Sequence, residues 1–302
     1  DEGNYMIRAT VNYEVTAPVI TSPADGAFTN QGKVTVEGTS APTTTVKVFN
    51  NGEEIASAET TEEGTFSSEV SLSEGENTLT AKAATESGST DASEPVKVIY
   101  DKTKPELAIT SPADKSKTNK ETVTVKGTVS DNNLDWVKVN GQAAMITDGE
   151  YSLRILLDEG ENTITVTAQD KAKNTEEKTI TVDAKYTAPV IENLLPEEDK
   201  ELKKGESVKI EFESEPGLKA TFAIRMPLTN AGGQLNNATE LPMMETSPGQ
   251  YVGYYTATSN VKAPGAEIEV KVTDAYGNET RKTAEGKLWI NAKKKNNSTK
   301  KQ

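Results

Sequence analysis

The stretch SEGENTLTAKA, residues 73 to 83, returns as DEGENTITVTA at residues 158 to 168. In both copies apolar and polar side chains alternate, and a period of two is typical of a strand with one buried face. The Glu-Gly-Glu-Asn before each run supplies a glycine for a positive φ angle and an asparagine that caps nearby backbone groups. Each strand is therefore expected to begin at a tight turn. The expected buried side chains are Leu79, Ala81 and Ala83 in the first copy and Ile164, Val166 and Ala168 in the second.

Other segments repeat around this one. ITSPAD at residue 20 and VTVEGT at residue 34 both return 89 residues later, the second as VTVKGT. AEIEVKVTDAYGN, from residue 266, repeats the same alternation a third time. The spacing suits domains of immunoglobulin size, and the many short alternating runs favour β-sandwiches. We therefore predict an all-β chain of three tandem immunoglobulin-like sandwiches over residues 16–103, 104–186 and a diverged 187–292. Residues 1–15 are expected to be the last strand of a truncated upstream domain, and 293–302 a disordered basic tail.

Composition excludes several chemistries at once. The 302 residues contain no histidine and no cysteine, so the chain has no Ser-His-Asp or Cys-His pair and no histidine or cysteine zinc site. The formal net charge of -14 disfavours binding to nucleic acid or anionic membranes, and it predicts a monomer because identical acidic surfaces repel. No apolar run is long enough for a membrane span.

The TSPADG opening, the VTVxGT strand, the VKVNG hairpin and the EGENTxTVxA strand resemble immunoglobulin-like repeats of secreted enzymes from Gram-positive bacteria. Repeats of the glucodextranase type are among them. The opening DEGNYMIRATVNYE resembles the end of the jelly-roll domain that follows the catalytic domain in certain secreted subtilisin-family serine proteases. The resemblance implies a region of such a protease, and the family's catalytic residues have no counterparts in this sequence.

An Asp-x-x-x-Asn spacing follows two of the repeated strands, at Asp170 with Asn174 and at Asp274 with Asn278. A hairpin turn held by hydrogen bonds from side chain to backbone is the favoured interpretation. The alternative is a calcium site, because calcium is bound by several oxygens at turns. No other cofactor is expected. In the first repeat the corresponding residues are Thr85 and Ser89, which weakens the calcium alternative there.

Aromatic residues suggest a different kind of site. Trp136 precedes Val137, which the repeat places on the buried face, so its ring is expected to face outward as a candidate ligand contact. Tyr254 and Tyr255 cannot both face inward in one strand, whereas Trp289 is expected in the core. The loop at 226–249 is rich in Gly, Asn and Pro and is a second candidate for binding.

The sequence therefore predicts a non-catalytic accessory or spacer region of a secreted bacterial protease, extracellular or associated with the cell wall. Such a region would position the upstream catalytic domain of the same polypeptide or contact protein substrate or cell-envelope polymer. The alternative is a carbohydrate-binding or adhesion module that acts through Trp136 or the 226–249 loop. An enzyme in its own right would need catalysis by carboxylates alone, and adjacent acids such as Glu62 with Glu63 are better explained as solvated surface.

Overall fold

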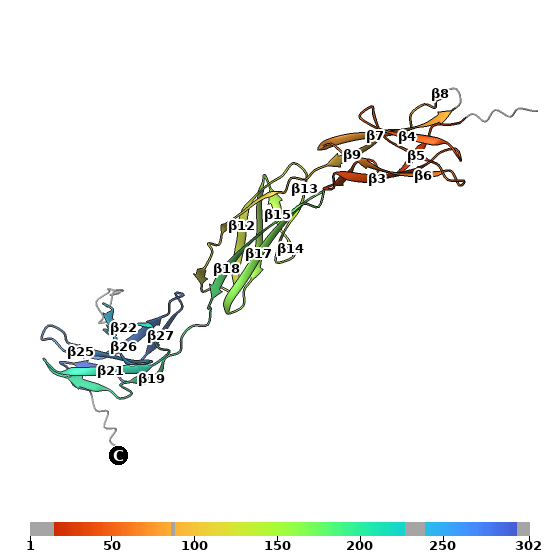
Figure 1. Ribbon diagram of the computed structural model, residues 1–302. Helices are drawn as coiled ribbons and strands as arrows, with labels where there is room; N and C mark the ends of the chain where they lie inside the picture. The colour runs from red at the N-terminus through yellow and green to blue at the C-terminus, as the bar shows by residue number, and fades with distance from the viewer. Residues whose placement is uncertain (1–14, 86–87, 227–238, 295–302) are drawn as a thin grey trace, which may run out of the picture. The chain divides into compact units, whose positions relative to one another are not determined.

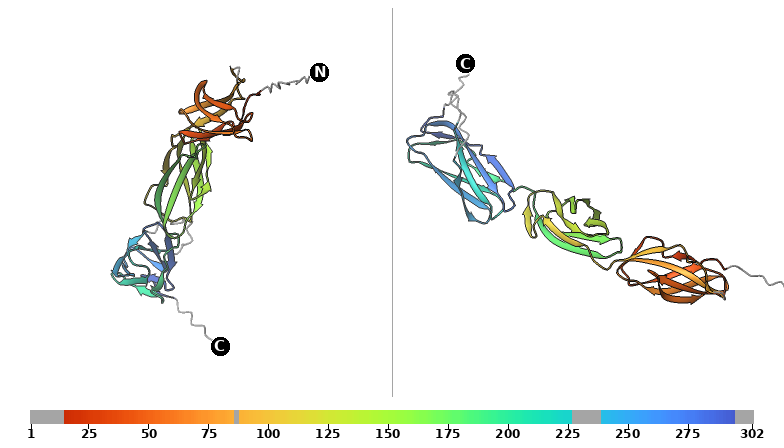
Figure 2. Two further views of the ribbon diagram at one scale, coloured as in Figure 1. Left: turned by 45° about the vertical axis from the view of Figure 1, so that its right-hand side comes forward. Right: turned by 90° about the horizontal axis from the view of Figure 1, so that it is seen from above.

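The computed structural model describes residues 15–85, 88–226 and 239–294, and within these ranges it contains strands and no helix (Figures 1 and 2). The first 14 residues and most of the basic tail therefore lie outside the described ranges. The strands form three groups, and each group has two sheets. Every sheet lies within one of the three predicted ranges, while the domain boundaries themselves stay a prediction.

The first group has a sheet of order β1-β3-β6 and a sheet of order β2-β9-β7-β4-β5, with β8 paired to β7. Strands β2 and β9 are parallel. The strands are β1 (Val19–Ser22), β2 (Ala27–Thr29), β3 (Lys33–Thr39), β4 (Thr45–Asn50), β5 (Glu53–Glu59), β6 (Thr65–Ser71), β7 (Gly75–Thr85), β8 (Gly88–Ser89) and β9 (Val96–Tyr100).

The second group has the orders β10-β12-β16-β15 and β11-β18-β17-β13-β14. Its strands are β10 (Glu106–Ser111), β11 (Ser116–Thr118), β12 (Thr122–Ser130), β13 (Leu134–Val139), β14 (Gln142–Ala143), β15 (Met145–Thr147), β16 (Glu150–Leu156), β17 (Gly160–Asp170) and β18 (Thr175–Ala184).

The third group has the orders β19-β21-β25-β24 and β20-β28-β26-β22-β23, with β27 paired to β26. Its strands are β19 (Glu192–Leu195), β20 (Lys200–Leu202), β21 (Ser207–Glu213), β22 (Lys219–Arg225), β23 (Leu241–Pro242), β24 (Met244–Ser247), β25 (Gln250–Thr256), β26 (Ala263–Thr273), β27 (Glu279–Thr283) and β28 (Leu288–Ile290).

The repeated strands β7 and β17 begin at their glycines, as predicted. Gly75 and Gly160 have φ angles of 95° and 100°. The amide of Asn77 donates to the carbonyl of Ser73 at 2.7 Å, and its side-chain oxygen accepts the Ser73 N–H at 2.8 Å. Asn162 caps Asp158 in the same way. The expected apolar face is confirmed, because all six predicted side chains are fully buried.

An aromatic ring on the partner strand packs over a glycine in the first two groups. A Cβ atom on Gly38 would lie 2.6 Å from the ring of Phe66, and one on Gly127 would lie 2.3 Å from the hydroxyl of Tyr151. In the third group the glycine is replaced by Phe212, whose ring stacks on Tyr251 at 5.1 Å between centroids. These glycines are needed for close approach rather than for a special φ angle.

The aspartate of the repeated opening motif has the same role in all three groups. The carboxylate of Asp25 accepts the Lys97 N–H at 2.8 Å, and the carboxylate of Asp114 accepts the Thr181 N–H at 2.8 Å. Asp199 accepts the Lys287 N–H at 2.9 Å. Each bond ties the motif's turn to a strand, or in the third group to the residue before one, more than 60 residues later.

The expectation that Trp289 lies in the core is wrong. Leu288 and Ile290 on either side of it are fully buried, so alternation turns Trp289 to the other face of β28. There it is half-buried, and its indole N–H donates to Asp199 at 3.4 Å. The prediction for the neighbouring tyrosines is confirmed, because Tyr254 is 64% exposed while Tyr255 packs against the core.

Candidate functional site

The two Asp-x-x-x-Asn segments form turns held by their own side chains. Asp170 is fully buried and accepts both the backbone N–H of Asn174 at 2.8 Å and its side-chain amide at 2.7 Å. Asp274 accepts the same two groups of Asn278, each at 2.9 Å. These are the hydrogen bonds of the turn interpretation.

The same asparagines also hold the linker that enters each group. The side-chain amide of Asn174 donates to the carbonyl of Asp101 at 2.7 Å, and that of Asn278 donates to the carbonyl of Lys185 at 2.6 Å. Sequence reasoning missed this contact, because the residues are 73 and 93 positions apart. One feature of the sequence pointed to this contact: each of the two linkers leads into a group that carries the Asp-x-x-x-Asn turn.

Three carboxylates meet at the first linker. Oxygens of Asp101, Asp131 and Asp170 all lie within 4.8 Å of one another. Asn133 donates its backbone N–H to Asp131 at 2.6 Å and its side-chain amide to Asp101 at 2.8 Å. Burial and the charges of Asp170 and Asp101 raise the pKa of the Asp131 carboxyl. Oxygen ligands from a linker, a loop and a strand end could hold a divalent cation.

A lysine takes the corresponding place at the second linker. The ammonium group of Lys185 lies 2.6 Å from a carboxylate oxygen of Glu215 and 3.8 Å from one of Asp274. Burial opposes ionisation of Asp274, but the hydrogen bonds from Asn278 and Tyr276 lower its pKa. The hydroxyl of Tyr276 donates to Asp183 at 2.5 Å. At this linker the chain itself therefore supplies one positive charge beside the carboxylates.

Trp136 lies on β13 opposite Gln169 and is half-buried. The ammonium group of Lys138 lies over its ring, 4.2 Å from the centroid, in a cation–π contact. Of the other candidate for binding, the 226–249 loop, residues 227–238 lie outside the described residues. Ligand contact by either one stays a prediction.

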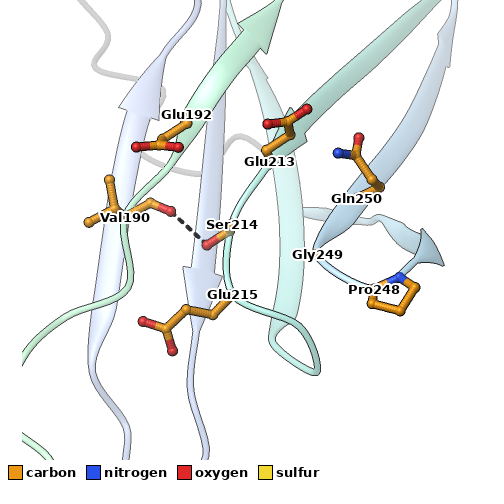
Figure 3. A pocket seen from close by; sticks show the side chains of 8 residues that line it. All are labelled: Val190, Glu192, Glu213, Ser214, Glu215, Pro248, Gly249 and Gln250. Carbon is orange, nitrogen blue, oxygen red and sulfur yellow. Dashed lines mark hydrogen bonds between the residues drawn. The ribbon is translucent and has the colours of Figure 1, made fainter.

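A pocket of about 420 Å³ in the third group is lined by Glu192, Glu213 and Glu215 (Figure 3). Hydrogen bonds from Gln250 and Asn193 lower the pKa of Glu213, so it remains a carboxylate and is unsuited to donate a proton. Glu215 is paired with Lys185. Ser214 donates its hydroxyl to the carbonyl of Val190 at 2.7 Å and is not activated by a base. The pocket therefore lacks the features of an acid–base pair.

Comparison with known proteins gives both a family and a fold. Residues 17–100 and 105–186 each match the family model described as glucodextranase, domain B. Bacillopeptidase F of Bacillus subtilis (strain 168) is 56% identical over 290 residues, which cover 96% of this chain and 20% of that protein. The chain thus spans about a fifth of the length of this relative.

Among solved structures, three immunoglobulin domains of titin in an E-to-A mutated variant have a TM-score of 0.50 at 12% identity, covering 91% of this chain and 98% of that one. An I-band fragment of titin gives the same TM-score and identity, covering 92% and 99%. At this identity the likeness establishes the immunoglobulin-like fold alone.

Proposed function

Because the chain belongs to the glucodextranase domain B family, with two copies of that domain, we propose that it is a non-catalytic accessory region of a secreted bacterial protease. It would act outside the cell or at the cell wall, where it positions the catalytic domain of the same polypeptide or contacts substrate or envelope polymer. The observation that carries the proposal is the 56% identity to one fifth of bacillopeptidase F.

The chemistry of the chain supports this role. The sequence has no histidine or cysteine, and two of the three carboxylates that line the pocket of Figure 3 are engaged, Glu213 by Asn193 and Glu215 by Lys185. Among the described residues no helix is long and apolar enough to cross a membrane.

Deletion of these residues from the parent protease tests the proposal. We expect kcat/KM for a short fluorogenic peptide to change by less than about two-fold, because the catalytic domain is elsewhere. Retention of the protease on washed cells, or cleavage of large protein substrates, is expected to fall. The isolated chain is expected to hydrolyse neither casein nor peptides. Hydrolysis by the isolated chain that survives serine-protease and metalloprotease inhibitors would overturn the proposal.

A divalent cation at the first linker is a second candidate function, favoured by the convergence of Asp101, Asp131 and Asp170. The lysine at the corresponding place of the second linker supports this candidate, because its ammonium group lies beside two carboxylates there. Calcium would then stabilise the linker rather than take part in a reaction.

Calcium titration in a thermal melt tests this candidate. Millimolar calcium after removal of metal by EDTA is expected to raise the melting temperature, and Asp131→Asn is expected to abolish the rise. The matched control is Glu215→Gln at the second linker, which should leave the calcium effect intact. If calcium does not change the melting temperature of the wild type, the cation site is excluded and the hydrogen-bonded turn is the remaining interpretation.

A further inference from the structure

The outer face of the sheet β19-β21-β25-β24 exposes apolar side chains side by side. Tyr254 is 64% exposed and Met244 is 73% exposed. Met244 pairs across the strands with Val252, which points to the same side as Tyr254 because the two are separated by one residue on β25. Figure 1 shows β25 beside β21. We call these residues, with Leu195, Lys209 and Glu211, the Tyr254 face.

The polar members of the Tyr254 face neutralise each other. Lys209 lies opposite Tyr254 and Glu211 lies opposite Val252 in the β21–β25 ladder. The two charged groups form an ion pair, and the hydrogen bond that Lys209 donates to Glu211 raises the pKa of Lys209. The Tyr254 face therefore carries no net charge, although the chain as a whole carries -14.

A hollow borders this face. It has a volume of about 510 Å³, and its lining includes Leu195, Ser207, Lys200, Lys209 and the four carboxylates of Glu197, Glu198, Glu201 and Glu211. An exposed aromatic ring therefore lies beside a concave, net acidic surface that offers carboxylates, ammonium groups and a hydroxyl group.

The fold does not require an aromatic residue at this position. The inward rings that correspond in the three groups are Phe66, Tyr151 and Tyr251. The residue three positions after the ring is Glu69 in the first group, Arg154 in the second and Tyr254 in the third. Glu69 is paired with Lys33 at 2.7 Å, and Arg154 donates to Thr122 at 2.8 Å. The first two groups thus have a charged side chain bound to its own sheet where the third exposes a phenol ring.

We propose that the Tyr254 face binds a neutral polysaccharide, an inference that rests on the accessory function proposed above. The apolar side of a sugar ring would stack on Tyr254 and Met244, while Lys209, Glu211 and Ser207 would hydrogen-bond to its hydroxyl groups. Charge excludes one class of ligand: an anionic polymer is repelled both by the acidic chain and by the glutamates that line the hollow.

Affinity electrophoresis of the purified chain in gels that contain dextran, soluble starch or hydroxyethylcellulose tests the proposal, with polygalacturonate as the anionic probe. We expect retardation by at least one neutral polymer and none by polygalacturonate. Tyr254→Ala is expected to weaken binding at least ten-fold, whereas Tyr254→Phe keeps the ring and should stay within about three-fold of the wild type. Arg154→Ala, at the corresponding position of the second group, is the matched control and should bind as the wild type does.

Circular dichroism melts of each variant check that the fold is intact, which is expected because Tyr254 points to solvent. Migration unaffected by every neutral polymer, or equal retardation of the wild type and Tyr254→Ala, would overturn the proposal. Neither result bears on the accessory function, which the deletion in the parent protease and the hydrolysis assays test separately.

Discussion

Single aspartates in the opening motif tie distant parts of each group together. Asp199 has the most partners of the three: besides the Lys287 N–H it accepts the indole of Trp289 and the ammonium group of Lys294, which lies 2.7 Å away. The hydrogen bond from Lys294 is the largest of the effects that lower its pKa to about 2. A carboxyl whose pKa is lower in the folded state than in the unfolded chain stabilises the fold when it is ionised.

We predict that Asp199→Ala lowers the melting temperature at pH 7 by roughly 3 °C, because the lost hydrogen bonds hold β28. The stabilisation by Asp199 is present above the unfolded-state pKa of about 3.9 and is lost as the pH falls towards 2. The difference between variant and wild type should therefore shrink between those pH values. Glu197→Gln, a nearby exposed carboxylate, is the control and should match the wild type. A difference that stays constant down to pH 2 would contradict this account.

We predict a large loss of stability for Gly127→Ala. The added Cβ atom would lie 1.9 Å from the carbonyl oxygen of Ala108 and 2.3 Å from the Tyr151 hydroxyl, so the backbone must move. The expected cost is about 3 kcal/mol of unfolding free energy, measured by urea denaturation. Gly141→Ala is the control: its Cβ meets no atom within 4 Å, and only its φ of 80° opposes the change. That cost should be about 1 kcal/mol. Equal costs for the two variants would argue against close packing as the cause.

At the scale of elements, β7 and β17 share a cap but differ in how deeply it is buried. Asn77 is fully buried and also accepts the side-chain amide of Asn50 at 2.7 Å. Asn162 is half-buried and makes only the bonds to backbone. A buried polar group that loses its partner costs more than one that water can reach.

We predict that Asn77→Ala lowers the unfolding free energy by about 3 kcal/mol and Asn162→Ala by about 1 kcal/mol, since only the first also leaves the buried amide of Asn50 without its partner. Urea denaturation of both variants measures the difference. A larger loss for Asn162→Ala than for Asn77→Ala would show that burial does not set the cost.

The sequence predicted these strands well because alternation and turn chemistry are local. Leu79 and Ile164 were placed correctly, and so were the glycines before them. It could not predict that Asp101 meets Asp131 and Asp170, because no local pattern relates a linker to a loop and a strand end. Trp289 was misplaced because β28 has only three residues, too few for its buried face to be identified from the sequence. The sequence did not predict the Tyr254 face; it predicted only that one of the two adjacent tyrosines faces outward.

At the scale of the whole molecule, composition and cores set the behaviour in solution. The first and third groups each have a separate cluster of buried apolar side chains. The net charge of -14 is expected to keep the chain monomeric at low salt, which light scattering can measure.

We predict that calorimetry resolves more than one unfolding transition, because cores joined by short linkers unfold as separate units. Asp199→Ala should shift the transition of the third group and leave that of the first unchanged. A single transition for the whole chain, with equal calorimetric and van't Hoff enthalpies, would contradict separate unfolding.

The hydrogen bond from each turn asparagine to a linker carbonyl affects how readily a protease can cleave the linker. A protease must draw a peptide into an extended shape and place its carbonyl oxygen among its own hydrogen-bond donors. The carbonyls of Asp101 and Lys185 are already held by Asn174 and Asn278, so the bonds after these residues are poor candidates for cleavage. Short connections of this kind would give the chain a long lifetime in a medium that contains proteases.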